Sequence, residues 1–149
     1  MHIDQRVVND SAGGAQPTAA QVGWFAARQP GLVRFLERRL LRGDGDAFAV
    51  ALEASWRICG VFERNDGVAP RRLAFSLLDR ASDGVARQSA SRRSVEGCAS
   101  RQPALCEWVN TLLDDPPLPL NPQETSAVGK ALFALVYALD EASFGREVI

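Results

Sequence analysis

Histidine is nearly absent from this 149-residue chain, because His2 is its only copy. Many hydrolytic and metal sites place a histidine beside a nucleophile, a carboxylate or a metal ion, and here a Ser/His or Cys/His pair has no plausible scaffold. His2 lies in a polar N-terminal segment, where a tail residue is the ordinary interpretation. The sequence also lacks a Gly-rich phosphate loop, a nucleotide fingerprint and a Glu-x-x-His pair. We therefore expect no catalytic residue, no metal ligand and no cofactor, and a protein that is not an enzyme.

Cysteine, lysine and long apolar runs are scarce too. Cys59, Cys98 and Cys106 are an odd number at spacings that match no zinc or redox motif. Three reduced, partly buried thiols are the simplest interpretation, and a Cys98–Cys106 disulfide is the alternative. No run approaches the roughly 18 to 20 apolar residues that span a bilayer. The first sixteen residues contain Asp4, Arg6 and Asp10 and lack the apolar stretch of a secretory signal. These features predict a cytoplasmic protein, and the preference for arginine over lysine (Lys130 alone) suggests a GC-rich bacterial genome.

Helical periodicity dominates what is present. Hydrophobic residues make up 46% and charged residues 23% of the chain, which is the composition of a globular protein. Capping residues, prolines at first turns and glycines at ends divide the apolar stripes into separate segments. No segment alternates as a half-buried strand does. The sequence predicts an all-α fold, a single bundle of about six helices, over residues 18–28, 30–42, 46–63, 70–81, 103–113 and 122–142, with a further short helix over 84–93.

The first sixteen residues are predicted to form a flexible leader, because a Gly-rich polar segment buries too little surface to offset its ordering entropy. Residues 17–149 then form the helical domain. Its two long apolar helices, 46–63 and 122–142, are expected at the centre. The predicted core is represented by Leu36, Leu52, Trp56, Leu77, Val109, Leu132 and Leu135, and packing at helical spacing is the first explanation for the tryptophans Trp24, Trp56 and Trp108.

A repeated tripeptide suggests an internal duplication. Arg28-Gln29-Pro30 recurs as Arg101-Gln102-Pro103, an offset of 73 residues. At the same offset several apolar residues of the following helices coincide, and each helix is followed by a loop and a long apolar helix. The segments 18–64 and 91–145 would then be two related three-helix halves. The alternative is that Gln-Pro is a common helix boundary and that any two amphipathic helices share an apolar stripe.

Both Arg-Gln-Pro corners are candidate binding sites. Each sets an arginine and a glutamine just before a helix whose first amides are free, which suits an anionic group of a partner. Arg28, Gln29, Arg101 and Gln102 are therefore partner-binding candidates. The competing interpretation is that these corners only begin helices and that the arginines form ion pairs within the chain.

Charge is unevenly distributed although the net charge is −1. Residues 1–101 hold 15 basic and 11 acidic residues, whereas residues 102–149 hold two basic and seven acidic ones.

The favoured function is a non-enzymatic protein-interaction or adaptor module that binds a protein partner or self-associates as a homodimer. The alternative is a nucleic-acid-associated regulator that uses the basic region from Arg87 to Arg101, with Arg92 and Arg93 as further candidates, and the third is a small-molecule-binding helical bundle.

Overall fold

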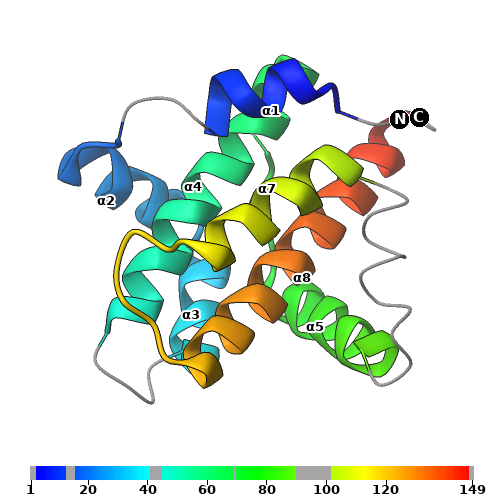
Figure 1. Cartoon of the computed structure of the whole chain (residues 1–149). Coiled ribbons are helices and arrows are strands. Elements are labelled where there is room, and N and C mark those ends of the chain that lie inside the picture. The colour runs from blue at the N-terminus through cyan, green and yellow to red at the C-terminus, as the bar shows by residue number, and fades with distance from the viewer. Residues whose placement is uncertain (1–2, 13–15, 41–44, 69, 90–101, 148–149) are drawn as a thin grey trace.

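A computed structural model describes residues 3–12, 16–40, 45–68, 70–89 and 102–147 of the chain. It confirms the predicted all-α class: within those ranges the chain forms seven helices and no strand (Figure 1). The helices are α1 (Gln5–Ala12), α2 (Ala19–Arg28), α3 (Pro30–Leu40), α4 (Asp46–Asp66), α5 (Phe75–Ser89), α7 (Pro103–Asp114) and α8 (Pro122–Glu147).

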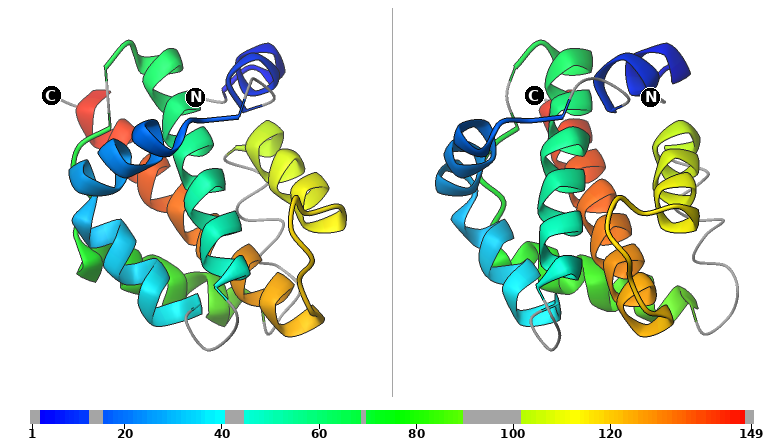
Figure 2. Two further views of the ribbon diagram at one scale, coloured as in Figure 1. Left: turned by 90° about the vertical axis from the view of Figure 1, so that its left-hand side faces the viewer. Right: turned by 60° about the vertical axis from the view of Figure 1, so that its left-hand side comes forward.

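The two long helices α4 and α8 lie side by side at the centre, and the shorter helices pack around them (Figures 1 and 2). α1 packs on α4 and α7, whereas α5 packs on α8 and α3. Among the helices that the structure describes, α2 alone shows no buried residue, and it contacts α3 and α4. The buried side chains of the other helices form one hydrophobic cluster. Because α2 adds nothing fully buried to this cluster, its outer face is available for another role.

Local capping signals account for the helix starts that the sequence predicts well. Thr18 and Gln21 form a capping box at α2, in which each side chain bonds the backbone of the other. Asn121 and Glu124 bond in the same reciprocal way at α8. Helix α4 begins at Asp46, the first residue of its predicted range. Gly45, with φ of +79°, precedes the helix, and Asp46 is its first residue, where an acid favours the dipole.

The predicted core is partly correct. Leu36, Val109, Leu132 and Leu135 are fully buried. Leu52, Trp56 and Leu77 are only half-buried. Leu52 and Leu77 pack against the cluster from outside, whereas Trp56 lines a pocket. Trp24 departs furthest from a core role, with 66% of its surface exposed.

The N-terminal segment differs from the prediction of a flexible leader. Residues 5–12 form α1, and Ile3 and Val8 are 4% and 0% exposed. Asp4 Oδ1 accepts the Arg6 amide at 2.8 Å and so caps the start of this helix. The burial of two aliphatic side chains and the packing of α1 on α4 and α7 offset the conformational entropy that the segment loses on folding. The prediction of a flexible leader did not include this stabilisation.

Helix α5 starts later and ends later than predicted. The chain from Pro70 to Ala74 is not helical, although Pro70 is suited to a first helical turn, and the helix runs from Phe75 to Ser89 without the break expected near residue 82. The cause of the late start is a tertiary contact: Gln29 holds the backbone of Arg71 and Leu73. Tertiary hydrogen bonds therefore override a local propensity here.

Candidate functional site

At both Arg-Gln-Pro corners the glutamine side chain forms hydrogen bonds to a distant segment of the chain. Gln29 is 5% exposed; its Nε2 donates to the Arg71 carbonyl at 3.1 Å and its Oε1 accepts from the Leu73 amide at 3.0 Å. Glycine at position 31 permits this close approach, because a Cβ there would overlap the Leu73 carbonyl oxygen. Gln29 thus forms hydrogen bonds to the non-helical segment that leads into α5.

Gln102 does the same at the second corner. It is 2% exposed; its Oε1 accepts from the Ile3 amide at 3.0 Å and its Nε2 donates to Asp140 Oδ1 at 2.8 Å. Ile3 lies two residues before α1, as Leu73 lies two residues before α5. Both glutamines satisfy a buried amide, and a partner could engage them only by breaking these bonds. Their described contacts support a structural role.

The arginine of the first corner is placed quite differently from its glutamine. Arg28 is exposed at the end of α2, and its guanidinium carbon lies 4.7 Å from the centroid of the Trp24 ring. This is a cation–π contact rather than the ion pair that the sequence suggested. Arg92, Arg93 and Arg101 lie outside the described residues, and for Arg87 the structure describes the backbone in α5 but not the side chain.

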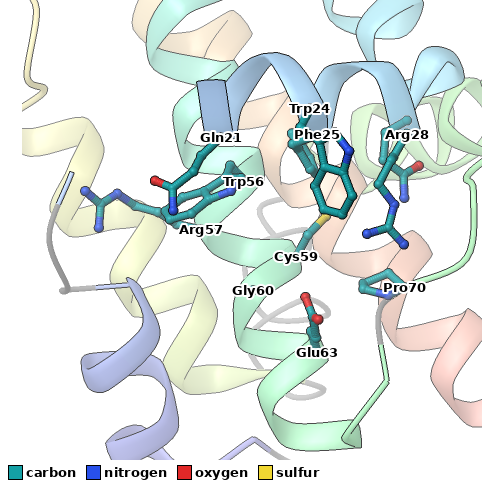
Figure 3. A pocket seen from close by; sticks show the side chains of 11 residues that line it. Gln21, Trp24, Phe25, Arg28, Trp56, Arg57, Cys59, Gly60, Glu63 and Pro70 are labelled. Atoms are coloured by element: carbon teal, nitrogen blue, oxygen red, sulfur yellow. The ribbon is translucent and has the colours of Figure 1, made fainter. Parts of the chain in front are cut away.

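A pocket of about 280 Å³ opens beside this pair, between α2 and α4 (Figure 3). Trp24 and Arg28 project from α2, while Glu63 and Pro70 lie across the opening from them. Gly60 forms part of the α4 wall, and a Cβ built there meets no atom within 4 Å. The full lining is Gln21, Trp24, Phe25, Arg28, Gln29, Trp56, Arg57, Cys59, Gly60, Glu63 and Pro70.

The charged residues of the lining differ in exposure: Arg28 and Glu63 are exposed, whereas the side chain of Arg57 is 11% exposed. Arg57 contacts Glu53 at 3.3 Å one turn earlier on α4. The thiol of Cys59 is buried, and burial, followed by the negative charge of Glu63, raises its pKa to about 12. A thiol that stays protonated is a poor nucleophile, so Cys59 contributes apolar surface. The pocket can therefore take an apolar group and place an arginine beside it.

Within the described ranges no three His, Cys, Asp or Glu side chains come together as a metal site. In the same part of the chain, no helix combines the length and apolar character that crossing a bilayer requires.

Sequence reasoning missed this site for identifiable reasons. Trp24 lies next to Phe25 on an amphipathic helix, so its exposure cannot be read from spacing. The only available signal was Gly60, an unexplained glycine inside a long helix, where glycine costs about 1 kcal/mol relative to alanine. A comparison with known proteins adds no guide to the site, since no family model, curated protein or solved structure matches the chain.

Proposed function

We propose that the chain is a non-enzymatic protein-interaction module whose binding site is the α2 surface, formed by Trp24, Arg28 and the pocket between α2 and α4. The observation that carries the proposal is the exposure of Trp24, 66%, on a helix that buries none of its own residues. Tryptophan and arginine are the residues most enriched at the energetic centres of protein interfaces. An indole held by a stacked guanidinium is also pre-ordered, which lowers the entropy lost on binding.

Pocket size is compatible with a single large side chain of a protein partner and lies near the lower end of the range for small-molecule sites. Sites for drug-sized ligands usually enclose about 300–1,000 Å³, and this pocket has about 280 Å³. A single large side chain of a partner fits that space, with the surrounding surface of α2 available for further contact. A small-molecule function remains the second candidate, and the pocket itself is the observation that favours it.

The proposal is tested by comparing affinity captures from the native cell. The bait is the whole chain, as wild type, Trp24→Ala or Leu118→Ala. Leu118 is the matched control, because it is another exposed apolar residue, 38% exposed, in the connector before α8. We expect a protein retained by wild type and Leu118→Ala to be lost with Trp24→Ala, while the melting temperatures of all three stay close together.

Self-association is measured on the same three proteins by sedimentation. If the partner is a second copy, wild type and Leu118→Ala form a dimer that Trp24→Ala does not. Captured proteins and oligomeric states that are the same for all three baits would contradict the proposal. A protein lost only together with the folded state of the variant would contradict it as well, and the melting temperatures identify that case.

A further inference from the structure

The helices correspond in pairs across the molecule. α1 packs on α4 and on α7, and α5 packs on α8 and on α3. The glutamine before α3 bonds the segment that leads into α5, and the glutamine before α7 bonds the segment that leads into α1. With α1 to α4 as the first half and α5, α7 and α8 as the described part of the second, each half therefore holds the first helix of the other. This reciprocal arrangement resembles that about an approximate two-fold axis between α4 and α8, from which the packing of α3 on α8 departs, since the described residues of α7 and α4 form no contact of similar extent.

Residues 51–62 of α4 and the corresponding stretch of α8 share one burial pattern at an offset of 77, whereas the buried residues Ala47 and Val50 fall on the half-buried residues Glu124 and Ala127. Every buried residue of α4 between positions 51 and 62 falls on a buried residue of α8. The pairs are Ala51 and Val128, Ala54 and Ala131, Ser55 and Leu132, Ile58 and Leu135, Cys59 and Val136, Val61 and Ala138, and Phe62 and Leu139. The half-buried aromatics Trp56 and Phe133 coincide too, and so do the acids Glu63 and Asp140.

One pair in this register differs sharply in size. Gly60, in the wall of the pocket, corresponds to Tyr137, which is half-buried and packs against the core. A Cβ at Gly60 would meet open space. The pocket thus lies where the first half lacks an aromatic side chain that the second half has.

We infer that the halves are diverged copies and that the pocket binds an aromatic side chain from an acidic segment of a partner protein, in the space that Tyr137 fills in the other half. The inference rests on the proposed function and names the chemistry of the partner. Arg28 stands at the rim, and Arg71 and Arg72 follow the lining residue Pro70 and are exposed. Against these three exposed arginines the lining has one exposed carboxylate, Glu63, so the exposed charge beside the pocket is net positive and favours an acidic flank on the incoming segment.

Tryptophan resonances provide a direct test on the whole chain. The protein has three tryptophans: Trp24 and Trp56 line the pocket, and Trp108 on α7 does not. Protein labelled with 5-fluorotryptophan is titrated with p-cresol, with acetyl-Asp-Tyr-amide and with acetyl-Lys-Tyr-amide. We expect the signals of Trp24 and Trp56 to shift and that of Trp108 to stay. The acidic peptide should bind about two- to fivefold more tightly than the basic one, and Arg28→Ala should remove that difference.

The decisive variant is Gly60→Tyr, which supplies the missing ring from within the chain. It should melt no lower than Gly60→Ala and should abolish the shifts. The matched control is Gly23, a helical glycine that also has open space around it but lies outside the lining. Gly23→Tyr should retain the shifts and melt below Gly23→Ala, because tyrosine is the poorer helix former and its ring gains no pocket there.

Three results would overturn the inference: no shift, shifts that persist unchanged in Gly60→Tyr, or shifts of all three tryptophans together. Binding of free p-cresol at least as tight as that of either peptide would also overturn it, since the ring would then come from a small free aromatic compound. The proposed function fails separately. If the peptide probes bind while the captured proteins do not depend on Trp24, the module proposal fails alone. If a captured partner depends on Trp24 but none of the aromatic probes binds in the pocket, the proposed function stands and the further inference is refuted.

Discussion

Gln102 is the residue on which the docking of the N-terminal helix depends most directly. Gln102→Leu keeps a side chain of similar size and removes the bonds to the Ile3 amide and to Asp140, 3.0 and 2.8 Å long. A buried amide left without a partner costs about 1–3 kcal/mol, and a hydrogen bond to a charged group contributes about 1.5–3 kcal/mol. Some of this loss is recovered by water reaching the freed groups. We expect the free energy of unfolding to fall by about 2–5 kcal/mol.

Urea denaturation followed by circular dichroism measures this loss at pH 7 and pH 4, and hydrogen exchange of the α1 amides locates it. Gln102→Glu adds a charge test, because it keeps an acceptor for Ile3 but places a second carboxylate against Asp140. Two adjacent carboxylates raise the pKa of the pair in the folded state. The penalty is therefore full at pH 7 and shrinks as the pH falls toward the unfolded value of about 4.3.

The deficit of Gln102→Leu should change less between the two pH values than that of Gln102→Glu, because Gln102→Leu introduces no second carboxylate and only removes the bond that Asp140 accepts. A loss below about 0.5 kcal/mol for Gln102→Leu would refute the idea that this side chain anchors the N-terminal segment. A deficit for Gln102→Glu that does not shrink at pH 4 would refute the electrostatic part of the argument.

Three further predictions concern the core, a close backbone approach and a buried thiol. Leu132→Ala, at a fully buried position of α8, should cost about 2–5 kcal/mol in urea denaturation. Gly31→Ala should lower the melting temperature, because its Cβ meets the Leu73 carbonyl, whereas Gly23→Ala should stabilise α2 by about 0.5–1 kcal/mol. Cys59 loses its proton near pH 9.0 when unfolded and near 12 when folded, so the folded state should lose stability as the pH rises from about 9. Thermal melts of Cys59→Ala should show a shallower fall over that range.

Helices bounded by local chemistry were predictable from the sequence. The capping box at Thr18 and the prolines at positions 30, 103 and 122 act within a few residues of themselves, and the helices they begin match the structure closely. The failures occur where a distant residue decides. α1 folds because α4 and α7 provide a surface for Val8, and Pro70 does not begin a helix because Gln29 bonds the residues after it.

The sequence could not separate the roles of two neighbouring residues in the first Arg-Gln-Pro tripeptide. Sequence reasoning selected Arg28 and Gln29 together, since both precede a helix start. In the structure Gln29 points inward to a neighbouring segment, whereas Arg28 lies outside against Trp24. Adjacent residues at a helix end project in different directions, so spacing alone could not separate a structural glutamine from an exposed arginine.

The register that pairs Gly60 with Tyr137 could not be predicted from the repeated tripeptide, because the two halves differ in loop length. The two Arg-Gln-Pro corners are 73 residues apart, but the buried residues of the central helices coincide best at 77. The connector before α8 is two residues longer than the one before α4, and α7 is one residue longer than α3, which accounts for three of the four residues of this difference. At an offset of 73, Gly60 falls opposite Phe133; at 77 it falls opposite Tyr137. The two registers differ by about one helical turn and present the same face, and burial favours the second because all seven buried residues of α4 from 51 to 62 coincide with buried residues at 77, against five at 73. A glycine in a helix is ordinarily only a loss of stability. Because Gly60 corresponds to Tyr137 at the offset of 77, it marks space that the chain leaves open beside Trp24, its most exposed tryptophan.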